Sequence, residues 1–91
     1  MESEKIEKIA NYYGLDHQIR KAKEELQELY TALLDYQLND SKENQKAVVT
    51  EIADVMIMIE QLKLLMGVNE DVEVEIEYKL NRQLKRIERE K

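Results

Sequence analysis

The sequence contains no cysteine, no proline, no tryptophan and no phenylalanine, and it has a single histidine, His17, in 91 residues. Without cysteine there is no disulfide framework, no thiolate zinc site and no thiol nucleophile. One histidine also excludes metal sites that need two imidazoles from one chain, such as the paired Glu-x-x-His motifs of di-iron helix bundles. No apolar run approaches the roughly 20 residues that cross a bilayer, and the N-terminus lacks a basic region followed by an apolar stretch.

Positive charge is also scarce. Lys and Arg number 14 against 20 for Asp and Glu, which gives a net charge of −6. A duplex-binding protein normally has the opposite balance, so we expect no nucleic acid polymer and no membrane as a partner. At 43% hydrophobic residues the chain is too apolar for a disordered tail,. We expect one small domain over residues 1–91 of a soluble cytoplasmic protein.

Only two glycines, Gly14 and Gly67, interrupt the chain, and without proline almost everything between them can be helical,. The spacing predicts four helices, an all-α fold, with the ranges 2–13, 16–39, 42–66 and 69–87. Asp16 and Asn69 are the predicted N-caps of the second and fourth helices. Before the third helix, Asp40 and Glu43 are predicted to form a capping box.

Each long helix has a seam of apolar residues at steps of three and four, which predicts packing on another helix. The third helix is apolar on all sides between Val55 and Ile59. It is therefore predicted to be central, and part of the core is predicted to lie between subunits. The seams consist of Ile19, Ala22, Leu26, Leu29, Leu33 and Tyr36, then Val48, Ile52, Val55, Ile59, Leu62 and Met66, then Val72, Ile76, Leu80, Leu84 and Ile87.

Two acidic pairs flank the seams of the second and third helices. Glu25 and Glu28 lie three residues apart, and Glu51 and Asp54 repeat this spacing. In an antiparallel hairpin both pairs reach the same edge of the helix interface. Two unit charges about 5 Å apart repel by about 3 kcal/mol at an effective dielectric of 20. The carboxylates must therefore protonate, separate into water or bind cations.

Oxygen ligands without histidine or cysteine favour Mg²⁺, with Mn²⁺ as a substitute, and Mg²⁺ bound by carboxylates recruits phosphates. Glu-x-x-Glu is also common on solvated helix faces, so the spacing alone leaves both interpretations open. Lys21 lies one turn before Glu25 and either contacts a phosphate or pairs with Glu25. Gln18, one turn earlier again, is a candidate for reading a nucleobase.

Residues 13–18, 21–29 and 51–58 together resemble the MazG-like nucleoside triphosphate pyrophosphohydrolases. The family motif is Glu-Glu-x-x-Glu, a spacer of one to three dozen residues, and then Glu-x-x-Asp. Here the spacer is residues 29–50, and the resemblance covers residues 13–86. It implies an all-α MazG-like domain that assembles as a homodimer or dimer of dimers. It also implies Mg²⁺-dependent hydrolysis of a (d)NTP between the α and β phosphates, which yields the monophosphate and pyrophosphate.

The resemblance further assigns roles to individual residues. The metal ligands by motif position are Glu25, Glu28, Glu51 and Asp54, and Glu24 supports them or faces a second ion. A late basic motif of the family, a lysine followed by two arginines, matches Lys79 and Arg82 as phosphate contacts. The second arginine position is Gln83 here, which puts the details of phosphate binding in doubt.

Two alternatives stay open. One is a noncatalytic helical interaction module that uses its seams to bind a partner helix. The other is a nucleotide sensor that binds without turnover, which the departure at Gln83 keeps open. A scaffold has no reason to place two acidic pairs beside two seams and should tolerate their replacement.

Overall fold

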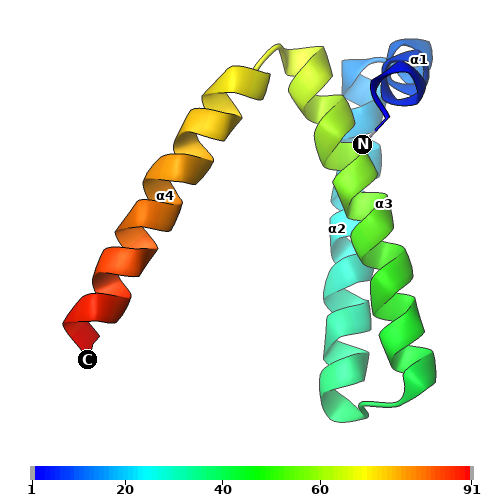
Figure 1. The fold of residues 1–91 in the computed structure, drawn as a ribbon. Coiled ribbons are helices and arrows are strands. Elements are labelled where there is room, and N and C mark those ends of the chain that lie inside the picture. Colours follow the sequence, from blue (N-terminus) through cyan, green and yellow to red (C-terminus); the bar gives the residue numbers. More distant parts are fainter. Residues whose placement is uncertain (1, 91) are drawn as a thin grey trace.

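A computed structural model describes residues 2–90, and every regular element in that range is a helix (Figure 1). The predicted all-α fold with four helices is therefore confirmed. No helix among these residues combines the length and the hydropathy that spanning a membrane requires. The helices are α1 (Ser3–Tyr13), α2 (Leu15–Leu38), α3 (Lys42–Met66) and α4 (Asn69–Glu90).

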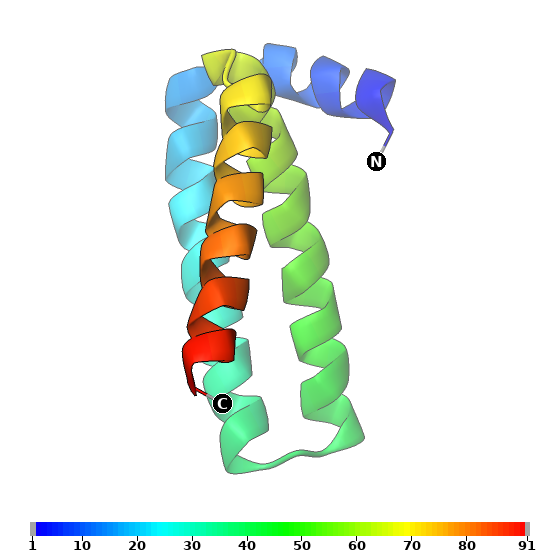
Figure 2. The ribbon, with the colours of Figure 1, turned by 60° about the vertical axis from the view of Figure 1, so that its left-hand side comes forward.

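Helices α2 and α3 form a long antiparallel hairpin, and α1 lies across the end of this hairpin at which α3 finishes (Figures 1 and 2). Helix α3 contacts each of the other three helices, which confirms its predicted central position. The two long helices approach each other along alanine side chains, because the buried apolar residues are few and mostly small. These buried apolar residues are Ile6, Ala10, Ala22, Ala32, Val55 and Met58.

The junction between α1 and α2 is a single glycine. Gly14 ends α1 as predicted, with its N–H donating to the Ala10 carbonyl, and it also occupies the N-cap position of α2. The prediction that Asp16 caps α2 is wrong, because the helix already begins at Leu15 and has no side-chain cap. The φ of +84° at Gly14 redirects the chain so sharply that no linker residue remains for capping.

The starts of α3 and α4 also differ from the predictions. The N-cap of α3 is Ser41, whose Oγ accepts a hydrogen bond of 3.1 Å from the Asn44 backbone N–H, so Asp40 lies one residue too early to form the predicted capping box. In α4 the Val68 carbonyl already accepts the first helical hydrogen bond, from the Val72 N–H at 2.9 Å. Asn69 is therefore the first helical residue rather than the cap.

Both glycines adopt positive φ angles, and we expect them to differ in their tolerance of alanine. Gly67 lies in the left-handed helical region with φ +66° and ψ +34°, where alanine costs about 1–2 kcal/mol,. Gly14, with φ +84° and ψ +169°, lies in a region that is essentially restricted to glycine,. No atom lies within 4 Å of a Cβ added at either site, so the cost comes from the backbone alone. Chemical denaturation should show a larger loss for Gly14→Ala than for Gly67→Ala, and the reverse order would contradict this account.

Helix α4 stands apart from the hairpin and contacts only α3, next to the turn that joins them (Figure 1). None of the residues 69–90 is buried. The radius of gyration is 16.1 Å, compared with about 12 Å for a compact domain of this length,. The accessible surface is 7607 Å², compared with about 5,500 Å² for a compact monomer of this mass,. About 2,000 Å² of surface that a compact fold would bury thus lies open.

Much of this open surface is apolar. Ten residues of the predicted seams remain 38% to 61% exposed, so the helices of one chain do not fully cover them. On α2 the interface runs through the buried residues Ala22, Glu25 and Ala32, of which only Ala22 belongs to the predicted seam, because the small alanine side chains let the helices approach closely. The ten residues, here termed the exposed seam, are Ile19, Leu26, Leu33, Ile52, Ile59, Met66, Ile76, Leu80, Leu84 and Ile87.

Candidate metal and nucleotide site

Three of the predicted carboxylates converge between the two long helices. Glu25 and Glu28 come from successive turns of α2, and Glu51 comes from the facing side of α3. One oxygen of each lies within 4.8 Å of the others. The spacing of three residues places the two α2 side chains on one face, and the antiparallel hairpin supplies the third. We term these three residues the carboxylate cluster.

Burial makes the carboxylate cluster electrostatically unfavourable as it stands. Glu25 is only 7% exposed. Desolvation raises the pKa of its carboxyl above the ordinary value of 4.5, Lys21 opposes the rise, and the charges of Glu28 and Asp54 add to it. The Oε2 atoms of Glu25 and Glu51 are both buried and have no hydrogen-bond partner. Such acceptors are costly unless a proton or a cation satisfies them.

The cluster fits a hard divalent cation. All its donor atoms are carboxylate oxygens, which is the ligand set that Mg²⁺ and Mn²⁺ prefer, and a Mg²⁺ site built on few protein ligands keeps positions for water or phosphate. The two unpartnered buried oxygens are the observation that carries this fit, since exposed acidic groups alone would not need a cation.

The two other predicted acidic residues lie beside the cluster rather than in it. Asp54 is close enough to Glu25 to raise its pKa, and it lines a cavity next to the cluster. Glu24 is exposed and pairs with Lys21, whose Nζ lies 3.7 Å from its Oε2. The structure thus brings three of the four predicted metal ligands together and places the fourth at the wall of the adjoining cavity.

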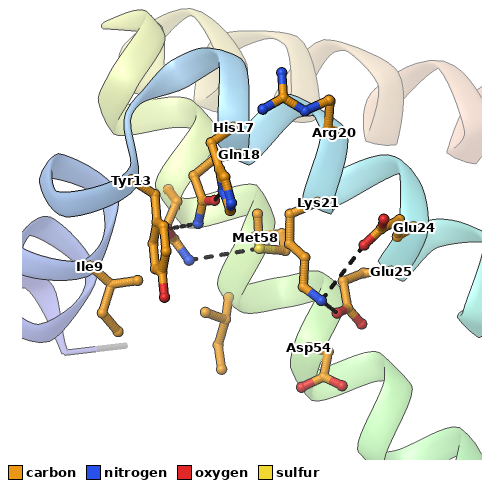
Figure 3. Close-up of a pocket in the computed structure, with 12 residues that line it drawn as sticks. Ile9, Tyr13, His17, Gln18, Arg20, Lys21, Glu24, Glu25, Asp54 and Met58 are labelled. Atoms are coloured by element: carbon orange, nitrogen blue, oxygen red, sulfur yellow. Dashed lines mark hydrogen bonds and ion pairs between the residues drawn. The ribbon is translucent and has the colours of Figure 1, made fainter.

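That cavity, of about 630 Å³, lies where α1, α2 and α3 meet (Figure 3). Its volume is in the range of small-molecule sites. Acidic, basic, amide and aromatic groups line it together. Its walls are formed by Ile9, Tyr13, His17, Gln18, Arg20, Lys21, Glu24, Glu25, Asp54, Ile57, Met58 and Gln61.

Lys21 is the cation nearest to the carboxylate cluster. Its Nζ lies 3.3 Å from Glu25 Oε1, and Figure 3 shows its side chain reaching toward Glu24 and Glu25. The charge-assisted hydrogen bond to Glu25 raises the pKa of the lysine further, so the amine stays protonated. The predicted pairing with Glu25 is confirmed, and the same position on the cavity wall leaves the amine available to an anion. Arg20, which the sequence did not single out, adds a second cation to the wall.

Gln18, the predicted candidate for reading a nucleobase, lies on the cavity wall, and it is joined there by a residue that sequence reasoning missed. Its Nε2 donates a hydrogen bond of 2.7 Å to the Oε1 of Gln61, and the two amides are 3% and 2% exposed. A signal for Gln61 was present, because Asp54, Met58 and Gln61 follow steps of four and three along α3 and so share a face,.

The predicted phosphate contacts on α4 are not brought to the site within one chain. Lys79 pairs with Glu75 on its own helix at 3.9 Å, and the Arg82 guanidinium lies 5.8 Å from the ring centre of Tyr78. Neither residue lines the cavity. Because α4 contacts only α3, near the connecting turn, both cations lie away from the carboxylate cluster of their own chain.

Comparison with known proteins adds no relative. The chain matches no protein-family model, no curated protein and no solved structure. The carboxylate cluster, the cavity and the exposed seam are therefore the features that bear on function.

Proposed function

We propose that this chain is a Mg²⁺-dependent nucleoside triphosphate pyrophosphohydrolase of the MazG-like type, which converts (d)NTPs to (d)NMPs and pyrophosphate and removes surplus or non-canonical nucleotides. The observation that carries the proposal is the pair of unpartnered buried oxygens, on Glu25 and Glu51, beside a cavity that also holds cations and amides. A bound cation would satisfy both oxygens at once and would offset the cost of burying them. A polyanionic ligand reaches such a site only with its charge neutralised.

The roles follow from position. Glu25, Glu28 and Glu51 hold the metal, Asp54 completes the set from the cavity wall, and Glu24 supports Lys21. A bound Mg²⁺ supplies charge neutralisation and lowers the pKa of a coordinated water. Lys21 exchanges its contact with Glu25 for a phosphate oxygen when the triphosphate enters. The cavity then surrounds the nucleoside and limits the access of bulk water to the reacting phosphate.

We further propose that the working unit is a homo-oligomer. The exposed seam and the open surface of about 2,000 Å² per chain support this, since two such surfaces fall in the range of obligate dimers. A second copy also offers a route for the α4 cations Lys79 and Arg82 to reach a carboxylate cluster, because α4 stands apart from the hairpin of its own chain (Figure 1).

A nucleotide sensor is the second candidate. It is favoured by the position of Lys79 and Arg82 outside the cavity and by Gln83 in place of a second arginine. The exposed seam also suits a helical interaction module. Both alternatives predict that no triphosphate is turned over, and the module additionally predicts that replacing the cluster carboxylates leaves partner binding unchanged.

The test is product analysis of a mixed panel of NTPs and dNTPs with Mg²⁺, comparing the native chain with Glu51→Gln. We expect monophosphate and pyrophosphate from the native chain, and a loss on the order of 100-fold in the variant, because a bound metal ion is worth several kcal/mol in the transition state. Glu7→Gln, a matched change on the exposed side of α1, should retain full activity. Diphosphate with orthophosphate, or no turnover with Mg²⁺ or Mn²⁺, would contradict the proposal.

A further inference from the structure

Two buried amides join α2 to α3 near the end of the hairpin that is farthest from its turn. The Gln18 Nε2 donates a hydrogen bond of 2.7 Å to the Gln61 Oε1, and the two residues are only 3% and 2% exposed (Figure 3). Each amide has one further contact. The His17 Nδ1 lies 2.6 Å from the Gln18 Oε1, and the Gln61 Nε2 lies 3.8 Å from the Met58 sulfur. The amide pair is thus a contact between the two long helices rather than a group turned to water.

The amide pair lies in line with the carboxylates of the candidate metal site. Seven residues forward along α2 from Gln18 is Glu25, and seven residues back along α3 from Gln61 is Asp54, whose charge acts on Glu25. Three further residues along each helix reach the other two members of the carboxylate cluster. Seven residues make about two helical turns, so these equal steps keep the same faces of α2 and α3 opposed. One register of the hairpin therefore pairs the amides and gathers the carboxylates.

That register has to be held against repulsion. Without a cation, the like charges of the carboxylate cluster push the two helices apart or along each other. The turn restrains one end, because α2 ends at Leu38 and α3 begins at Lys42, and the amide pair lies beyond the cluster at the other end. A slip of one residue, about 1.5 Å, would break the bond between Gln18 and Gln61 and leave two buried amides unpaired, which is costly. Apolar contacts are not directional and tolerate such a slip.

We propose that Gln18 and Gln61 are positioning residues of the metal site, whose hydrogen bond holds α2 and α3 in the register that makes the carboxylate cluster selective for Mg²⁺ over Ca²⁺. This inference rests on the proposed function, because it concerns the metal that the function requires. Mg²⁺ demands near-ideal octahedral geometry with oxygens at about 2.0–2.1 Å, whereas Ca²⁺ accepts flexible arrangements at about 2.3–2.6 Å. An error in register therefore weakens the binding of Mg²⁺ more than that of Ca²⁺.

The experiment is isothermal titration calorimetry with MgCl₂ and with CaCl₂ at matched ionic strength, which gives the ratio of the two affinities. Gln18→Met with Gln61→Met keeps the size of both side chains and removes the hydrogen bond without leaving an amide unpaired. We expect the Mg²⁺ affinity to fall by about 10-fold or more, the range for groups that orient metal ligands, and the Ca²⁺ affinity to fall less. The melting temperature in metal-free buffer should change little, because apolar replacement of both partners is nearly neutral.

The matched control is Gln37→Met with Gln45→Met, which makes the same two changes at exposed positions of α2 and α3 and should leave both affinities intact. If the buried double variant does not fold, Gln61→Asn replaces it, since this side chain keeps the amide but is one methylene too short for the bond. A merely structural role would move the melting temperature and leave the ratio of affinities at its native value. That result would overturn the inference and leave the proposed function standing, whereas a native chain that binds neither cation would overturn both.

Discussion

In metal-free buffer at neutral pH, Glu25→Gln should melt at a higher temperature than the native chain, and Mg²⁺ should reverse that order. The native carboxylate is buried next to Glu28 and Glu51 and has one oxygen without a partner. An amide of the same shape removes a charge from this group and can still accept a hydrogen bond from Lys21. Without a cation the native glutamate thus makes the folded chain less stable than glutamine does, and with a cation the glutamate becomes a ligand.

The expected shift is large for a chain of this size. Removing one of several like charges within about 5 Å removes about 1–3 kcal/mol of electrostatic repulsion at an effective dielectric of 20. For a domain of under 100 residues each kcal/mol moves the melting temperature by about 4–8 °C. Binding of Mg²⁺ at 100 times its dissociation constant stabilises the native chain by about 2.7 kcal/mol, and the variant should lose most of this gain.

The pH dependence has a definite sign. Because the pKa of Glu25 is raised above 4.5 by burial, the folded state holds this proton more tightly than the unfolded chain does. The stability of the metal-free native chain should therefore fall as the pH rises from about 4.5 through the folded pKa, and then level off. Glu25→Gln should lack this decline.

Differential scanning calorimetry with and without MgCl₂, at matched ionic strength with NaCl, measures these effects. Glu7→Gln is the control, since it removes one exposed negative charge without touching the carboxylate cluster. If NaCl stabilises the native chain as much as MgCl₂ does, or if Glu25→Gln melts lower in metal-free buffer, the cluster is not a cation site.

The sequence was sufficient for the helices and for the convergence of the acidic residues. A period of 3.6 residues and two glycines determine the elements, and the spacing of Glu25, Glu28 and Glu51 on a hairpin brings their oxygens together. These features depend on local geometry, which the sequence encodes directly. The caps were less predictable, because adjacent residues such as Asp40 and Ser41 have similar capping ability, and the outcome depends on a shift of one residue.

Two features needed the structure because they depend on long-range packing. The predicted seams are apolar stripes, but α2 buries a line that shares Ala22 with its seam and adds Glu25 and Ala32, where the small alanine side chains allow close approach. The Gln18–Gln61 pair joins residues 43 positions apart. The spacing places Gln61 on the same face of α3 as Asp54 and Met58, but an amide in an amphipathic helix looks solvent-facing until the facing amide is known,.

The exposed seam leads to the second large expected effect, in which Leu80→Lys with Leu84→Lys should convert a dimer into monomers. These two leucines of α4 are 52% and 61% exposed in one chain and belong to the exposed seam. If a second copy covers that seam, the substitutions bury two charges without partners. We therefore expect self-association to weaken by at least about 100-fold, since an unpaired buried charge costs several kcal/mol.

Sedimentation velocity at low micromolar concentration measures the effect. The native chain should sediment as a dimer or larger, well above the 10.8 kDa of one chain. Val74→Lys is the matched control: Val74 is also an apolar residue of α4 and is 70% exposed, but it lies on a different face of the helix from Leu80 and Leu84,. It should leave the association unchanged.

The two ways of covering the exposed seam give different outcomes. If α4 instead folds back onto its own hairpin, the native chain is a monomer with a radius of gyration near 12 Å, and that result would contradict the homo-oligomer. If a second copy covers the seam, the leucine substitutions should also lower hydrolysis, because Lys79 and Arg82 then reach the carboxylate cluster only across the interface. Loss of the dimer with full retention of activity would assign phosphate binding to Lys21 and Arg20 alone, and would remove the α4 cations from the site.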